Sequence, residues 1–229
     1  MKDYNCPIHN SVCIGEMNEE HTKNKGTGAG GSNTNINGKS FEMKTSNEPR
    51  LLELGFVRKN IPGVSDKSKN GFYYEKHLTP TTTVFYLTQG GLKAYFKYFF
   101  GKEMCRCPDE AYLFKNIDGD EGGAVTYILK ILEKKNQNTS GSVDTKLLAG
   151  GGFIDEYLFC LNGTGTGTGT GTFTVEYAFC INDYLKKEYI ADTKKSEALR
   201  FIHKKHRISV LFGDDADYFD TLDTWLFHE

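Results

Sequence analysis

Residues 107–143 read CPDEAYLFKNIDGDEGGAVTYILKILEKKNQNTSGSV, and this stretch decides the expected fold. Two apolar segments, 111–114 and 126–132, flank a polar turn whose Asp and Gly residues favour tight changes of direction. The pattern therefore predicts two strands that pair through a hairpin. The second segment is almost continuously apolar, which is typical of a central strand covered on both faces.

Acidic residues stand at the outer ends of both segments, where pairing would make them neighbours. Asp109 follows Pro108 at the start of the first segment, and Glu133 follows the second. Lys135 comes two residues after Glu133, so both side chains are expected on one face of the sheet. Two carboxylates can hold a hard divalent cation, and a nearby lysine can position an attacking water. This combination predicts hydrolysis of a phosphodiester.

Asp109, then 23 intervening residues, then Glu133-Lys134-Lys135 resemble the signature of the PD-(D/E)XK nuclease superfamily, to which most type II restriction endonucleases belong. The resemblance implies an α/β fold (α+β, mixed sheet) with a restriction-endonuclease-like αβββαβ core flanked by helices. It implies that Asp109 and Glu133 bind Mg²⁺ together with the backbone carbonyl of Lys134, and that Asp109, Glu133 and Lys135 are catalytic. The implied activity is Mg²⁺-dependent cleavage of double-stranded DNA.

Two further acidic residues leave alternatives open. Glu110 would face away from Asp109 in a regular strand, although a local bulge would exchange their roles. Glu42, within GKSFEMK, resembles a glutamate that often reaches the metal site from the first helix of the family. A surface glutamate on that helix is the other interpretation. The rival triplet Glu42-Met43-Lys44 has no Pro-Asp before it and lies in a helical stretch, so we do not assign it as catalytic.

Polar residues after the triplet are candidates for DNA binding. Asn136 and Gln137 carry amides that can pair with phosphate or with the edge of adenine. Ser142 and Lys146 stand before and at the start of the next expected helix, where a lysine can meet a phosphate across the cleft. Local turn and capping roles remain the alternative for all four.

The rest of the chain predicts one domain behind a polar arm. Residues 1–37 end in a glycine-rich stretch without apolar periodicity, which indicates a flexible N-terminal arm, and residues 38–229 are expected to form a single nuclease domain. The Gly-Thr repeat at 163–172 is expected to be a loop, with phosphate contact as the alternative function. A first helix is expected over 39–54, interrupted or ended near Pro49. Further helices are expected over 91–100, 145–161, 197–205 and 218–227, and further strands over 71–74, 82–87, 173–181 and 208–212.

Composition excludes several classes of protein. A chain of 229 residues with 38% hydrophobic residues can bury one sizeable core. No segment approaches the roughly 18 apolar residues of a membrane span, and the first residues lack a signal-peptide pattern, so we expect an intracellular, cytoplasmic protein with no membrane partner. The net charge of −2 argues against unspecific coating of nucleic acid.

Six cysteines are too few for a disulfide-dense secreted scaffold, so reduced thiols are expected. A zinc site at Cys6, His9 and Cys13, or at Cys105 and Cys107, stays open, although neither group has the paired spacing of a strong zinc motif.

A two-fold homodimer is the expected assembly, because cutting both antiparallel strands of a duplex requires two sites. Two alternatives stay open. One is a structure-specific or nonspecific repair or recombination nuclease with the same site, and the other is a non-catalytic DNA-binding module of the same fold.

Overall fold

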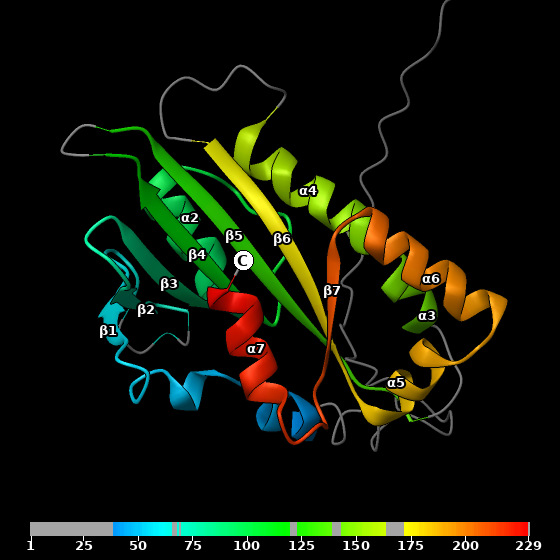
Figure 1. Cartoon of the computed structure of the whole chain (residues 1–229). Helices are drawn as coiled ribbons and strands as arrows, with labels where there is room; N and C mark the ends of the chain where they lie inside the picture. Colours follow the sequence, from blue (N-terminus) through cyan, green and yellow to red (C-terminus); the bar gives the residue numbers. More distant parts are fainter. Residues whose placement is uncertain are drawn as a thin grey trace, which may run out of the picture. The chain divides into compact units, whose positions relative to one another are not determined.

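The fold is taken from a computed structural model that describes residues 39–65, 68, 70–119, 123–138, 143–163 and 172–228. Within these residues a seven-stranded mixed sheet has its strands in chain order (Figure 1). The strands β1 to β5 pair with one another in antiparallel fashion, whereas β6 and β7 run parallel to β5. The strands are β1 (Val57–Asn60), β2 (Phe72–His77), β3 (Thr82–Thr88), β4 (Glu110–Ile117), β5 (Val125–Lys135), β6 (Thr172–Ile181) and β7 (Ile208–Phe212).

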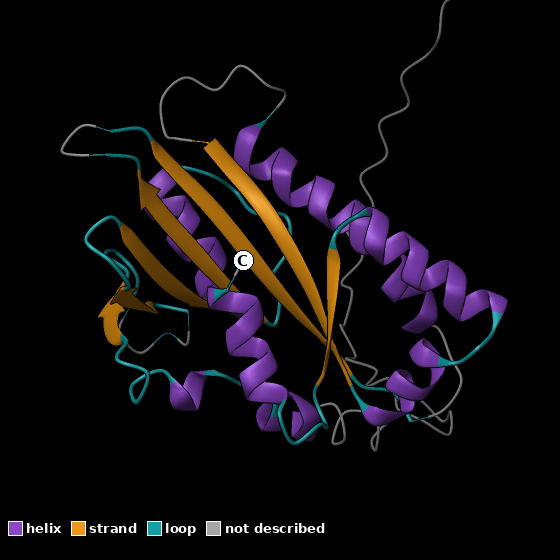
Figure 2. Ribbon diagram, in the orientation of Figure 1, coloured by secondary structure: helices purple, strands orange, loops and turns teal. Residues whose placement is uncertain are grey.

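Helices cover both faces of this sheet (Figure 2). One face carries α2 (Gln89–Phe100), α3 (Val143–Leu148), α4 (Gly150–Asn162), α5 (Asp183–Ile190) and α6 (Lys194–Lys205). The opposite face carries α7 (Tyr218–Phe227), the helical residues 39–44 and the short 3-10 helix η1 (Glu48–Arg50). In the described ranges, no helix combines the length and the apolar character that crossing a membrane would require.

Side chains of each strand alternate between the two faces of the sheet, so a hydrophobic core forms on each face. In β5, Leu129 and Ile131 join the core under α2 and α4, while Leu132 joins the core under α7. In β6, Tyr177 and Phe179 belong to the first of these cores. Successive side chains of a strand point to opposite faces, so an almost continuously apolar strand must be covered twice. The expected central position of β5 and the expected mixed sheet flanked by helices are therefore confirmed.

Two of the expected helical ranges, 39–54 and 145–161, contain shorter helices in the structure. The helix expected over 39–54 with a break near Pro49 ends earlier, at residue 44, and Pro49 stands in η1. The helix expected over 145–161 is divided into α3 and α4 at Ala149. Gly150 follows this break and packs against β7 and β6, where an added Cβ would lie 2.7 Å from Ile208 Cδ1 and 3.0 Å from Phe179 Cε2.

Two elements were not predicted. All four residues of β1 are exposed, so this edge strand carries no alternating apolar signal. Helix α5 buries only Leu185 among its described residues, which leaves its helical period almost invisible in the sequence. The expected arm of residues 1–37 and residues 164–171 of the Gly-Thr repeat lie outside the described residues.

Candidate active site

The hairpin of β4 and β5 brings Asp109 to the end of β5. The register pairs Glu110 with Leu132, so Asp109, one residue before β4, stands opposite Glu133. An Asp109 carboxylate oxygen accepts a hydrogen bond of 2.6 Å from the backbone N–H of Lys134. The half-buried Asp109 side chain is thereby fixed beside the Glu-Lys-Lys triplet.

Glu133 and Lys135 lie on one sheet face and form an ion pair. The distance from Lys135 Nζ to Glu133 Oε1 is 2.5 Å, and both side chains remain partly accessible, at 16% for the lysine and 24% for the glutamate. The expectation that these two side chains share one face of the sheet is confirmed by that contact. In the same strand Lys134 points to the opposite face, where its side chain is 3% exposed.

Like charges gather around this ion pair. Burial raises the pKa of the Glu133 carboxyl, and the negative charge of Asp109 raises it further, while Lys135 lowers it. Burial also raises the pKa of Glu42, again with a contribution from Asp109, and Lys134 and Lys135 act against the shift. The Asp109 charge therefore acts on both Glu42 and Glu133.

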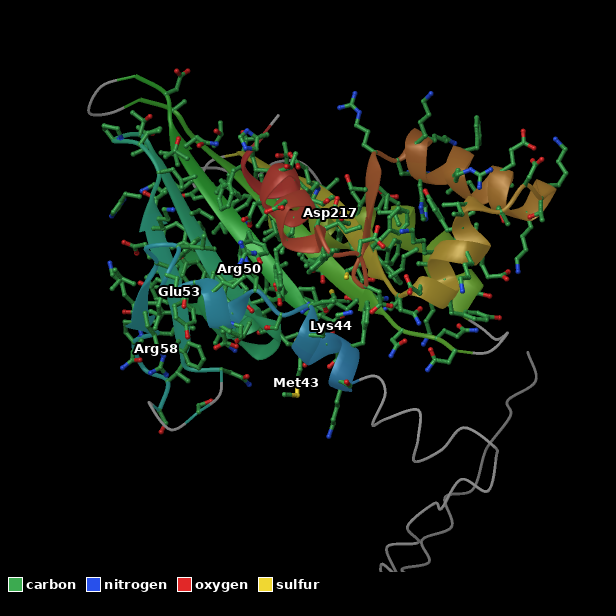
Figure 3. All side chains as sticks on the ribbon, turned by 60° about the horizontal axis from the view of Figure 1, so that its bottom comes forward. Met43, Lys44, Arg50, Glu53, Arg58 and Asp217 are labelled. Carbon is green, nitrogen blue, oxygen red and sulfur yellow. The ribbon has the colours of Figure 1, made fainter. Side chains whose placement is uncertain are left out.

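The helical residues 39–44 position Glu42 near Asp109. The backbone carbonyl of Glu42 accepts a hydrogen bond of 3.3 Å from Lys134 Nζ. Lys44, the lysine of the rival triplet, instead pairs with Asp214 at 3.0 Å, and the exposed Met43 side chain projects outward (Figure 3). Glu42 contacts the β4–β5 hairpin through its backbone carbonyl, and its carboxyl lies close enough to Asp109 for that charge to raise its pKa.

A second ion pair lies on the other side of the same strands. Lys134 Nζ is 2.7 Å from Glu110 Oε1, and each side chain is 3% exposed. The same carboxylate accepts hydrogen bonds from the backbone N–H of Asn47 at 3.0 Å and from the Tyr112 hydroxyl at 2.9 Å. Strand alternation therefore separates Glu110 from Asp109, and β4 begins without the bulge that would exchange their roles.

The buried Glu110–Lys134 pair was missed by sequence reasoning, which assigned Lys134 only a carbonyl. The register between β4 and β5 indicates this pair. Glu110 faces Leu132, so Lys134 is its diagonal neighbour on the same face, within reach of a long side chain.

A cleft of about 380 Å³ borders the carboxylates. Glu42, Asp109, Glu110 and Lys134 line it, but Glu133 and Lys135 do not. The other residues of its wall are Lys39, Met43, Ser46, Glu48, Tyr86, Thr88 and Gln89. Asp109 therefore stands at the boundary between this cleft and the face that carries the Glu133–Lys135 pair.

Two tyrosines border Glu133 on its own face. Burial raises the pKa of Tyr157 in α4 and of Tyr177 in β6 well above the usual range, and the charge of Glu133 is the next cause for both. Both phenols therefore keep their protons near neutral pH and are potential hydrogen-bond donors. Sequence spacing gave no signal for them. Tyr177 comes beside β5 through the parallel register of β6, in which it pairs with Ile131, and Tyr157 comes there through the packing of α4 on β6.

The candidate DNA-binding residues that the structure describes lie in different surroundings. The backbone of Gln137 exchanges hydrogen bonds with Asn182, the N-cap of α5, and the Asn182 amide also reaches Asn138 at 3.2 Å. The segment after β5, which includes Asn136, is thus tied to a helix start. Lys146 is exposed on α3, whereas Ser142 lies outside the described residues.

The donor set suits a hard cation better than a soft one. Carboxylates and a backbone carbonyl are oxygen ligands, and Mg²⁺ is commonly bound through one or two carboxylates with its remaining positions filled by water and phosphate. Across the residues that the structure describes, no three His, Cys, Asp or Glu side chains converge closely enough to form a ready metal cluster. The Glu133 oxygen is instead engaged by Lys135.

Comparisons with family models, with curated proteins and with solved structures give no match to this chain.

Proposed function

We propose that this chain is a Mg²⁺-dependent endonuclease that hydrolyses phosphodiester bonds of double-stranded DNA, of the sequence-specific type II restriction kind. One observation carries the proposal: Asp109 stands opposite Glu133, and Lys135 contacts Glu133 at 2.5 Å. An acid, a second acid and a lysine thus meet at one end of a hairpin. These are the positions that resemble the PD-(D/E)XK signature.

The order of elements supports the same reading. A helix at residues 39–44 precedes the antiparallel strands β3, β4 and β5, which α4 then connects to the parallel strand β6. With β1 and β2 set aside, and with α2 inserted between β3 and β4, this order is compatible with the αβββαβ core that the resemblance implies. The two additional strands β1 and β2 extend the sheet beyond β3.

In this proposal Asp109 and Glu133 hold the cation, aided by Glu42 and the Lys134 carbonyl. A bound Mg²⁺ would lower the pKa of a coordinated water and stabilise negative charge on the phosphate. Ligation by Glu133 would weaken its ion pair with Lys135. The freed ammonium would then donate a hydrogen bond to the attacking water or to the scissile phosphate.

The test compares three proteins on a long duplex of known sequence, with Mg²⁺ or with a chelator. The wild-type chain should give discrete Mg²⁺-dependent fragments, and the Lys135→Ala variant should be slower by about 10²- to 10³-fold, because one charge-stabilising donor is lost. Lys115→Ala is the matched control. Lys115 is a half-buried lysine toward the other end of the same hairpin and should keep full activity.

The fragment pattern separates the alternatives. A smear, or cleavage only at branched or damaged substrates, would replace the restriction activity by a nonspecific or structure-directed one. Intact DNA in every lane, with retained DNA binding, would leave a non-catalytic module. Equal loss in Lys115→Ala and Lys135→Ala would contradict the assigned role of Lys135.

The proposed assembly on DNA is a two-fold homodimer, because one site per protomer can cut only one strand at a time. Sedimentation of the protein with a short cognate duplex tests this, and one protomer per duplex would contradict it.

A further inference from the structure

The segment between α2 and β4, residues 101–109, is held against α4 by side chains outside the candidate active site. Arg106 Nε lies 2.6 Å from a Glu156 carboxylate oxygen, and its guanidinium stands 4.4 Å from the centre of the Phe153 ring. One residue earlier, Cys105 Sγ is 3.1 Å from Cys160 Sγ. Phe153, Glu156 and Cys160 repeat at helical spacing, so one face of α4 contacts both Cys105 and Arg106.

From this contact we propose that Cys105 and Cys160 are a redox site, a dithiol that closes reversibly to a disulfide. Both are free thiols, and they come from elements separated by 55 positions in the chain. A disulfide bond is about 2 Å long, so the sulfurs need to approach by only about 1 Å. The Arg106 contacts already hold the two segments together, so closure needs no new docking.

The oxidant is a small disulfide of the glutathione type. Cys105 is exposed, so its thiolate attacks one sulfur of the small disulfide, forming a mixed disulfide and releasing one small thiol. The Cys160 thiolate then attacks the Cys105 sulfur and releases the second small thiol. Two cysteine thiols lose two electrons and two protons, and the small disulfide becomes two thiols.

The surroundings of Cys105 control the rate of this thiol–disulfide exchange. The hydrogen bond with Cys160 is the main cause of a raised pKa of the Cys105 thiol, with Glu156 also raising it and Lys93 opposing the shift. A raised pKa leaves little thiolate near neutral pH, so the site should react slowly there. Exchange at mildly alkaline pH should be faster.

Closure would join the segment that leads into Asp109 to the helix that carries Tyr157. This covalent link constrains the unfolded chain as well as the segment itself, so the oxidised protein should have the higher Tm, by several degrees. The proposal does not depend on nuclease activity, because the disulfide can be detected in the protein alone.

The experiment equilibrates the full-length protein with glutathione buffers of increasing oxidised fraction at mildly alkaline pH, then blocks remaining thiols by alkylation. Trypsin cuts after Lys102 and Arg106 and so separates Cys105 from Cys107, while chymotrypsin separates Cys160 from Cys180. Mass spectrometry without reduction should find the peptide of Cys105 linked to that of Cys160, with the link removed by excess reduced glutathione.

Three variants sharpen this result. Cys105→Ser and Cys160→Ser should each abolish the linked peptide and the rise in Tm, whereas Cys107→Ser, which changes the neighbouring thiol of the same segment, should leave both intact. A link from Cys105 to any other cysteine, a disulfide-bonded dimer, or two fully alkylated thiols at every buffer ratio would overturn the proposal.

Discussion

The Glu110 carboxylate and the Lys134 ammonium connect three parts of the chain. Glu110 belongs to β4, Lys134 to β5, and the Asn47 N–H and the Glu42 carbonyl that they bind belong to the segment before β1. The Asn47 amide also donates to the Tyr112 hydroxyl at 2.9 Å. The network thus holds the helical residues 39–44, with Glu42, against the strands that carry Asp109 and Glu133.

Removing one partner of this pair should destabilise the protein strongly. Lys134→Met leaves the Glu110 charge buried without its counter-ion, which costs about 3–5 kcal/mol of unfolding free energy. The double variant Glu110→Gln with Lys134→Met removes both charges while the glutamine still serves Asn47 and Tyr112. It should recover most of that loss. Urea unfolding measures both, and a double variant as unstable as Lys134→Met would contradict the buried-charge explanation.

At the scale of elements, the break between α3 and α4 decides where α4 lies on the sheet. Helix α4 begins with three glycines that differ in their surroundings. Gly150 touches Ile208 and Phe179, and a Cβ at Gly151 would lie 2.9 Å from the His206 ring, whereas a Cβ at Gly152 would meet nothing within 4 Å. The sequence does not distinguish the three glycines. In the structure, Gly150 and Gly151 allow α4 to lie close to β6, β7 and His206, whereas the position of Gly152 is open.

Alanine substitutions at the ends of this triplet should act in opposite directions. Gly152→Ala should stabilise the fold by about 0.5–1 kcal/mol, because an exposed helical position gains helix propensity. Gly150→Ala should destabilise it by about 1–3 kcal/mol, because the added methyl overpacks the contact with β6 and β7. Chemical denaturation compares the two, and equal shifts in the same direction would show that the contact does not govern α4.

At the scale of the whole molecule, His203 joins elements from three parts of the chain. This side chain of α6 is 1% exposed, and its Nε2 lies 2.9 Å from the Leu147 carbonyl of α3. Its ring stacks on Phe179 of β6 and on Tyr189 of α5, each at 5.6 Å. Because Nε2 must donate to the carbonyl, Nδ1 is the unprotonated nitrogen, and it is buried with no hydrogen-bond partner among the described residues.

Acid should therefore weaken the fold through this histidine. Burial lowers the pKa of His203 below its ordinary 6.5, so the unfolded chain takes up the proton first. The stabilisation of the folded state that results from this pKa difference is complete above about pH 6.5 and is lost as the pH falls below that value. The free energy of unfolding then decreases by up to about 1.4 kcal/mol per pH unit, until His203 in the folded protein is also protonated. Urea unfolding at a series of pH values measures this slope. His203→Phe, which keeps the stacking, should reduce it, and an unchanged slope would refute the assignment.

Much of the fold could be read from local patterns. The strand at 208–212 and the helix at 218–227 match β7 and α7 to the residue, because their apolar spacing is determined by residues next to each other in the chain. The opposite orientation of Glu133 and Lys134 follows from the two-residue period of a strand. Exposed β1 and sparsely apolar α5 lacked this signal and were missed.

The sequence by itself therefore determined the hairpin of residues 107–135 and the neighbourhood of Asp109, Glu133 and Lys135, because a short turn and strand alternation are local constraints. Only the tertiary structure decided that Lys134 meets Glu110, that Tyr157 and Tyr177 border Glu133, and that Cys105 meets Cys160. These contacts depend on register and on how α4 packs against the sheet. Many arrangements of distant segments share the same local periodicity, and only side-chain packing selects among them.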